Sequence, residues 1–224
     1  MSLRPRQFLR HCLRPALRLA LTGVMPALLV PAMAAAQAQA PAQPGGDLAR
    51  VGAHLRGLAA MTADFTQTDR TGKTLTGTLS LKQPGKIRFQ YAPGVPLLVV
   101  SDGRALSFVD YQVRQVSRWP IGGSPLGVLL DPRKDLSRVA RIVPSGQSDV
   151  VNVLVRDPKH PEYGAITLAF TQRGDAPGGL LLQGWVALDA QNNRTTVRLA
   201  NQRLNPPLSD TLFRFTDPRR DRQR

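Results

Sequence analysis

The sequence contains one cysteine, Cys12, and little of the side-chain chemistry on which most enzymes depend. Beyond Cys12 there is no thiol, so that part of the chain can form no disulfide, thiolate nucleophile or cysteine-ligated zinc site. Glu162 is the one glutamate, and the aspartates fall mostly in turns between hydrophobic runs. No paired carboxylates or metal-binding cluster is therefore indicated.

Near-neutral bases are equally scarce, because beyond the N-terminal forty residues only His54 and His160 are present. Neither lies in a recognisable motif. The segment 122–127 resembles a nucleophile elbow, but its second glycine is one place late and Pro125 follows the serine. Ser124 is better interpreted as a helix cap. We expect no enzymatic activity, no cofactor and no bound metal.

Aromatic residues are few, with seven Phe, three Tyr and two Trp in 224 residues. This scarcity argues against rows of aromatic side chains that stack on bases. The formal net charge is +15, yet 42% of the residues are hydrophobic, which favours a folded basic domain over a disordered polycation. The positive charges are spread along the chain, apart from an arginine-rich end at residues 218–224. We therefore expect a solvated basic surface, a flexible basic tail over 218–224 and no nucleic-acid partner.

A hydrophobic run long enough to span a bilayer is also missing. The first forty residues carry five Arg and no acid, followed by an apolar stretch, residues 17–30, and an alanine-rich segment. Pro26 and Pro31 interrupt the apolar part, which falls short of the ~20 residues that a membrane span needs. This pattern predicts a cleavable signal peptide over residues 1–38. Residues 41–224 hold 25 Lys and Arg against 15 Asp and Glu, a formal charge of +10.

The remaining chain reads as one domain, residues 47–217, after a short Pro/Gly linker at 39–46. Apolar residues at helical spacing predict a helix over 47–60, and from Met61 the hydrophobic period changes to two. Turn residues separate these alternating runs. Further strands are predicted at 96–101, 104–110, 112–118, 149–156, 163–173, 179–189 and 193–204, and a second helix, or two short ones, over 124–138.

About ten successive strands with few helices predict a single curved antiparallel sheet or barrel, mainly β, with helices to plug it. The apolar face of such a sheet has two interpretations. It can form a cavity that holds acyl chains, since each buried methylene contributes about 0.8 kcal/mol. It can equally be the filled core of a small barrel, and periodicity alone favours this second interpretation.

Four sequence patterns resemble the periplasmic outer-membrane lipoprotein carriers, the LolA family. They are the run Phe65-Thr66-Gln67, the strand pattern from Leu79 to Phe89, the hairpin from Val100 to Phe108 and the helix start Ser124-Pro125-Leu126. The similarity extends over about residues 47–216. Order, spacing, signal peptide and length together make it specific.

The resemblance implies an unclosed antiparallel barrel of about ten to eleven strands with a helical lid. It also implies a periplasmic monomer that binds the acyl chains of lipoproteins. Such a carrier takes its cargo from an inner-membrane ABC transporter (LolCDE-like) and delivers it to an outer-membrane acceptor (LolB-like). The alternatives are a protein of this fold that carries another lipid, or an interaction module that binds none.

Two kinds of site residue follow from the resemblance and the strand parity. In the family an arginine just before the strand-ending proline holds the lid closed; here Gln83 occupies that position, so the latch is weaker or Lys82, Lys86 or Arg88 supplies it. The expected acyl-chain-binding residues are Phe65, Leu79, Leu81, Ile87, Phe89, Tyr91, Leu98, Val100, Leu106, Phe108, Leu126, Leu129 and Leu130.

Overall fold

The computed structural model describes residues 44–121, 126–131 and 133–219. They belong to one compact unit, Pro41–Arg224. The expected signal peptide and the helix start at Ser124 lie outside the described residues. No helix of the described part combines the length and the apolar character that crossing a membrane requires.

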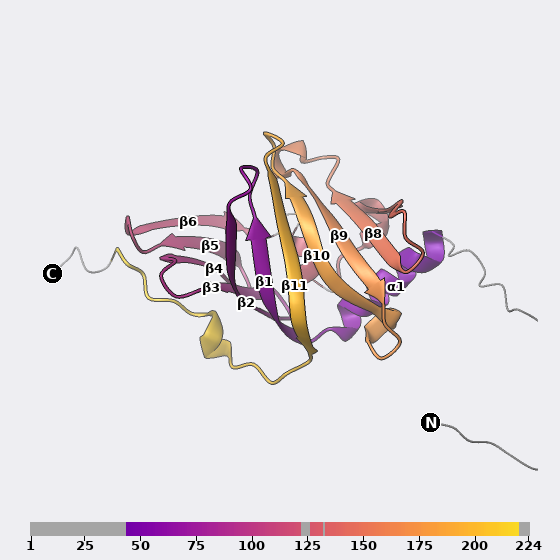
Figure 1. Cartoon of the computed structure of the whole chain (residues 1–224), viewed down its shortest axis with the longest axis horizontal. Coiled ribbons are helices and arrows are strands. Elements are labelled where there is room, and N and C mark those ends of the chain that lie inside the picture. The colour runs from indigo at the N-terminus through magenta and orange to yellow at the C-terminus, as the bar shows by residue number, and fades with distance from the viewer. Residues whose placement is uncertain (1–43, 122–125, 132, 220–224) are drawn as a thin grey trace, which may run out of the picture. The chain divides into compact units, whose positions relative to one another are not determined.

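Eleven antiparallel strands form one sheet in the order β6-β5-β4-β3-β2-β1-β11-β10-β9-β8-β7 (Figure 1). The edge strands β6 and β7 do not pair with each other, so the barrel is unclosed, as predicted. The helices are α1 (Pro44–Gly57), α2 (Gly127–Leu130), η2 (Leu136–Arg138), η3 (Pro161–Tyr163), η4 (Pro177–Gly179) and η5 (Asp210–Phe213). The strands are β1 (Ala60–Thr68), β2 (Thr74–Lys82), β3 (Lys86–Tyr91), β4 (Leu97–Asp102), β5 (Ala105–Asp110), β6 (Gln115–Pro120), β7 (Ala140–Val143), β8 (Val150–Arg156), β9 (Ala165–Gln172), β10 (Leu180–Leu188) and β11 (Arg194–Leu204).

Two predicted elements differ clearly from the structure in their boundaries, and one strand was not predicted. Helix α1 begins inside the expected linker, at Pro44, and ends three residues early, at Gly57. Strand β6 begins at Gln115, not at 112, because Asp110 Oδ1 accepts hydrogen bonds from the amides of Gln112 and Val113 and closes a turn there. Strand β7 was not predicted, since four residues are too few to show an alternating pattern.

The main hydrophobic core lies on one face of the sheet, which we call the inner face. Alternate residues of every long strand point to it, and α1 and α2 cover it with Val51, Leu55, Leu129 and Leu130. The pleat of a β-strand explains this arrangement, because residues at i and i+2 point to the same face. The inner face is thus packed beneath two helices that are distant in the sequence.

A second, smaller core lies on the opposite, outer face of β4 and β5. There Phe213 of η5 packs with Leu98, Val100 and Val109, and Leu208 and Phe215 pack around them. The segment after β11, residues 205–219, therefore crosses the outer face of the sheet; it is the yellow chain that runs past β2 and β3 (Figure 1).

Two glycines allow close approach. In the middle of β2, a Cβ on Gly77 would lie 2.1 Å from the carbonyl oxygen of Gln90 on β3. Gly178 in η4 has a positive φ of 67° and sits against α1, where a Cβ would lie 2.2 Å from the carbonyl oxygen of Arg50. Arg50 donates in return to the carbonyls of Gly178 and Gly179, at 3.3 and 3.1 Å, which fastens α1 to the β9–β10 connection.

Candidate functional site

The β2–β3 turn, which we define as residues 82–86, joins the sheet to both helices of the inner face. The side-chain nitrogen of Gln83 donates to the carbonyl oxygen of Leu55 on α1 and to that of Leu129 on α2, each at 3.2 Å. These carbonyls lie at helix C-termini, where intrahelical donors run out. Gln83 therefore supplies donors to two helix ends at once.

Backbone contacts reinforce the same turn. The Gln83 amide donates to Ala59 O at 2.8 Å, and the Gly85 amide donates to Leu130 O at 2.8 Å. The hydroxyl of Ser101, which is fully buried, donates to Gly85 O at 2.6 Å and fixes the turn from β4. The buried Oε1 of Gln83 has no hydrogen-bond partner within the described part of the chain.

The three cations suggested as substitutes for a lid arginine point elsewhere. Lys82 donates to Leu208 O and to Asp210, Lys86 pairs with Asp210, and Arg88 donates to the carbonyls of Leu212 and Arg214. All these partners belong to the C-terminal segment on the outer face. Within the described residues, the side-chain hydrogen bond from this turn to α2 comes from Gln83.

Most of the predicted binding residues share the inner face and the main core. Phe65, Leu79, Leu81, Ile87, Phe89 and Tyr91 are buried there, together with Leu129 and Leu130 of α2. Phe65 is in edge-to-face contact with Phe89 and Tyr91, at centroid distances of 5.3 and 5.2 Å. Tyr91 donates to Gln67 at 2.9 Å, and burial raises the pKa of the Tyr91 hydroxyl. Partly buried Leu126 packs against the same core.

The prediction is wrong for Leu98 and Val100, which lie on the outer face of the sheet. Register places Val99 opposite both Phe89 and Phe108, so Val99 faces inward, and Leu98 and Val100 face the Phe213 core. The sequence did not reveal this, because β4 is apolar at four successive positions and is covered on both sides.

The inner face is less completely covered at the β4–β6 end. Leu106 and Phe108, both predicted, are half-buried there. Prediction missed Leu97, Val99 and Trp119, of which Trp119 lies opposite Leu106 and is 52% exposed. These residues can be identified by following the strand pairing outward from inward-facing Phe89, which lies opposite Val99. That pairing is known only from the fold.

One of the two histidines noted in the sequence lies in the core. His54 is fully buried on α1; its Nδ1 lies 3.1 Å from Pro177 O and its ring meets Phe170 edge-on at 5.3 Å. Burial lowers the pKa of His54, despite that hydrogen bond. No group of three His, Cys, Asp or Glu that could hold a metal ion is found within residues 44–121, 126–131 and 133–219. The arrangement is that of an apolar sheet face covered by two helices.

Comparison with known proteins identifies the family. Residues 56–216 match the family described as outer membrane lipoprotein carrier protein LolA. An outer-membrane lipoprotein carrier protein of Chromobacterium violaceum is 29% identical over 200 residues, which cover 86% of this chain and 93% of the relative. An outer-membrane lipoprotein carrier protein of Bordetella avium is 30% identical over 166 residues, which cover 70% of this chain and 77% of the relative. The crystal structure of a LolA superfamily protein from Nitrosomonas europaea aligns with a TM-score of 0.42 and 11% identity, over 78% of this chain and 99% of that one.

The family match spans the inner-face strands, α2 and the β2–β3 turn. The chain belongs to the LolA family of outer membrane lipoprotein carrier proteins.

Proposed function

We propose that the protein is a periplasmic carrier that shelters the acyl chains of lipoproteins on the inner face of its sheet. In this role it receives lipoproteins from an inner-membrane ABC transporter of the LolCDE type and passes them to a LolB-like outer-membrane acceptor. Support comes from membership of the carrier family and from the predicted signal peptide, which would direct the chain out of the cytoplasm.

The observation that carries the proposal is the uneven cover of the inner face. Around Leu79 and Phe89 the apolar surface is closed beneath α1 and α2. At the β4–β6 end, Leu106, Phe108 and Trp119 continue the same surface while partly exposed to water. An apolar surface that begins exposed and continues under a short helix gives an acyl chain a place to bind first and a larger area beyond it.

The cover is held by few polar contacts. Helix α2 has four residues, and its described side-chain and backbone ties to the β2–β3 turn are the Gln83 and Gly85 hydrogen bonds. A neutral hydrogen bond contributes a net ~0.5–1.5 kcal/mol, whereas each methylene removed from water contributes about 0.8 kcal/mol. A few methylenes bound beneath α2 would offset the loss of these hydrogen bonds, and the acyl chain would also have to replace the packing of Leu129 and Leu130, which are buried in the main core.

A release assay tests the proposal. Purified protein lacking residues 1–38 is added to spheroplasts that synthesise a lipoprotein, and the lipoprotein in the supernatant is quantified. We expect release of the acylated lipoprotein in complex with the protein, and no complex with a variant whose lipid-bearing cysteine is replaced by serine. Native mass spectrometry of the complex should show the acyl-bearing mass; a non-acylated or lipid-free partner would overturn the proposal.

A pair of variants locates the site. Phe108→Asp places a charge on the half-exposed inner face and should reduce complex formation at least tenfold, because an acyl chain would have to desolvate the carboxylate. Leu188→Asp makes the same change at the exposed end of β10 and should bind as the parent does. Equal binding by Phe108→Asp, with an unchanged fold, would exclude the β4–β6 end as the entry surface.

A further inference from the structure

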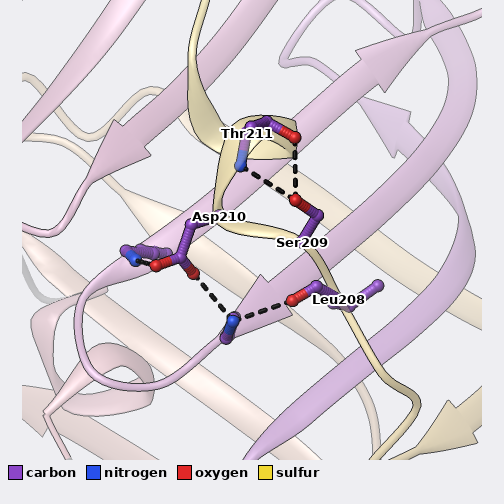
Figure 2. A network of polar contacts seen from close by, with 6 residues as sticks. Leu208, Ser209, Asp210 and Thr211 are labelled. Atoms are coloured by element: carbon purple, nitrogen blue, oxygen red, sulfur yellow. Dashed lines mark hydrogen bonds and ion pairs between the residues drawn. The ribbon is translucent and has the colours of Figure 1, made fainter.

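The C-terminal segment contacts the β2–β3 turn on the face of the sheet opposite to α2. Its core anchor is Phe213, which is 2% exposed. Just before this anchor, Ser209 caps η5: its hydroxyl accepts from the amide of Thr211 and lies 2.8 Å from the Thr211 hydroxyl (Figure 2). Cap and anchor together fix the position of the residue between them, Asp210.

Asp210 binds both ends of the β2–β3 turn. Its Oδ1 lies 2.7 Å from Nζ of Lys82, and its Oδ2 lies 2.9 Å from Nζ of Lys86. Lys82 also donates to Leu208 O at 2.7 Å (Figure 2). The hydrogen bonds from Lys82 and Lys86 lower the pKa of Asp210 to about 2, so the carboxylate stays charged at every pH at which the protein would work.

The two lysines need such a partner. Lys82 and Lys86 are directly opposite each other in the β2–β3 register, and like charges at opposed positions of an antiparallel pair destabilise it. Their side chains are only 32% and 23% exposed, which limits how far they can separate into water. A carboxylate that bridges them removes the repulsion at the base of the turn.

The base of the turn determines where Gln83 and Gly85 point. Gln83 directly follows Lys82, and Gly85 directly precedes Lys86, and these two residues make the contacts to α2. We propose that Asp210 is a positioning residue: by bridging Lys82 and Lys86 from the outer face, it holds the turn in the geometry from which Gln83 and Gly85 keep α2 closed.

The C-terminal segment thereby influences α2 from the opposite face of the sheet, while Asn205, at the start of the segment, donates to Gly57 O at the end of α1 at 3.2 Å. Whatever draws Asp210 away from the lysines weakens the closure of α2. The importance of that closure for cargo rests on the proposed function, but the contact itself can be measured on the cargo-free protein.

Hydrogen exchange resolved by NMR provides the test, with the amides of Gly85, Leu129 and Asp131 as reporters of the turn and of α2. In Asp210→Asn, which keeps the shape and removes the charge, we expect exchange about two- to fivefold faster at all three, as suits the loss of an exposed ion-pair network. Asp217→Asn, the same change farther along the segment, is the control and should leave these amides unchanged. Asp210→Glu should restore most of the protection.

Coupling distinguishes positioning from general destabilisation. If Asp210 acts through Gln83, Asp210→Asn should accelerate exchange at Leu129 and Asp131 much less in a Gln83→Ala background than in the parent. Parent protein in 1 M salt should behave like Asp210→Asn, since screening weakens the same contacts. Unchanged exchange in Asp210→Asn, or equal acceleration in both backgrounds, would overturn the proposal.

The two proposals fail separately. A parent protein that releases no acylated lipoprotein would contradict the carrier function and leave the exchange results standing. Normal release together with unchanged exchange in Asp210→Asn would contradict only the role of Asp210.

Discussion

The side-chain nitrogen of Gln83 lies 3.2 Å from the carbonyl oxygen of Leu129, so an amide occupies the place where the family resemblance leads one to expect a guanidinium. The same nitrogen reaches Leu55 O, while the amide oxygen is buried without a partner in the described residues. A glutamine thus makes the bridge between turn, α1 and α2, but leaves one acceptor unsatisfied.

Replacing Gln83 with arginine should strengthen the hold on α2. Guanidinium has five donors and no acceptor, so it removes the orphan oxygen, and hydrogen bonds from a charged donor contribute about 1.5–3 kcal/mol. We expect slower hydrogen exchange at Leu129 and Asp131 in cargo-free Gln83→Arg than in the parent, and faster exchange in Gln83→Ala. If neither variant differs from the parent, position 83 does not control α2.

A side chain at Gly77 should destabilise the sheet, because the backbone of β3 lies too close to leave room for it. A methyl group there would meet Gln90 O at 2.1 Å and the ring of Phe65 at 2.8 Å, so β2 and β3 must move apart. We expect Gly77→Ala to lower the free energy of unfolding by about 1–3 kcal/mol in denaturant titrations. Gly174→Ala, where nothing lies within 4 Å of the new methyl, is the control. Equal stability of the two variants would show that the β2–β3 spacing is not tight.

Acid should weaken the docking of α1 through His54. Because burial lowers the folded-state pKa below the unfolded value of 6.5, the unfolded state binds the proton more readily. The stability that neutral His54 supports is therefore fully present above pH 6.5 and is lost as the pH falls through the lowered pKa. The loss is about 1.4 kcal/mol for every tenfold difference in proton affinity between the unfolded and folded states.

Unfolding titrations at pH 7.5 and 5 measure this effect. We expect the parent to lose more stability between pH 7.5 and pH 5 than His54→Gln does, because only the parent has the buried imidazole. A pH dependence of His54→Gln identical to that of the parent would contradict the assignment.

Removing the anchor of the C-terminal segment should be costly. Phe213 fills the outer-face core with Leu98, Val100 and Val109, so Phe213→Ala should reduce the free energy of unfolding by about 3–5 kcal/mol. Leu212→Ala, one residue earlier but 36% exposed, should cost less than about 1 kcal/mol. Thermal unfolding of the two variants gives the comparison, and similar losses would mean that the segment is not held by the Phe213 core.

Features that depend on neighbouring residues in the chain could be predicted from the amino-acid pattern. Alternating apolar residues in β1, β2 and β3 identified strands and the inner-face positions of Phe65, Leu79 and Phe89, because a strand covered on one face shows its parity in its composition. Family-like motifs and turn residues likewise indicated an unclosed antiparallel barrel with a helical cover, which the topology confirms.

Features that depend on contacts between distant segments could be seen only in the folded protein. Strand β4 is apolar on both faces, and only the return of Phe213 to its outer side shows that Leu98 and Val100 face away from the inner core. The bridge from Asp210 to Lys82 joins residues 128 positions apart, a distance over which no local pattern carries information. The bridge forms because the segment after β11 crosses the outer face, where its apolar side chains cover those of β4 and β5.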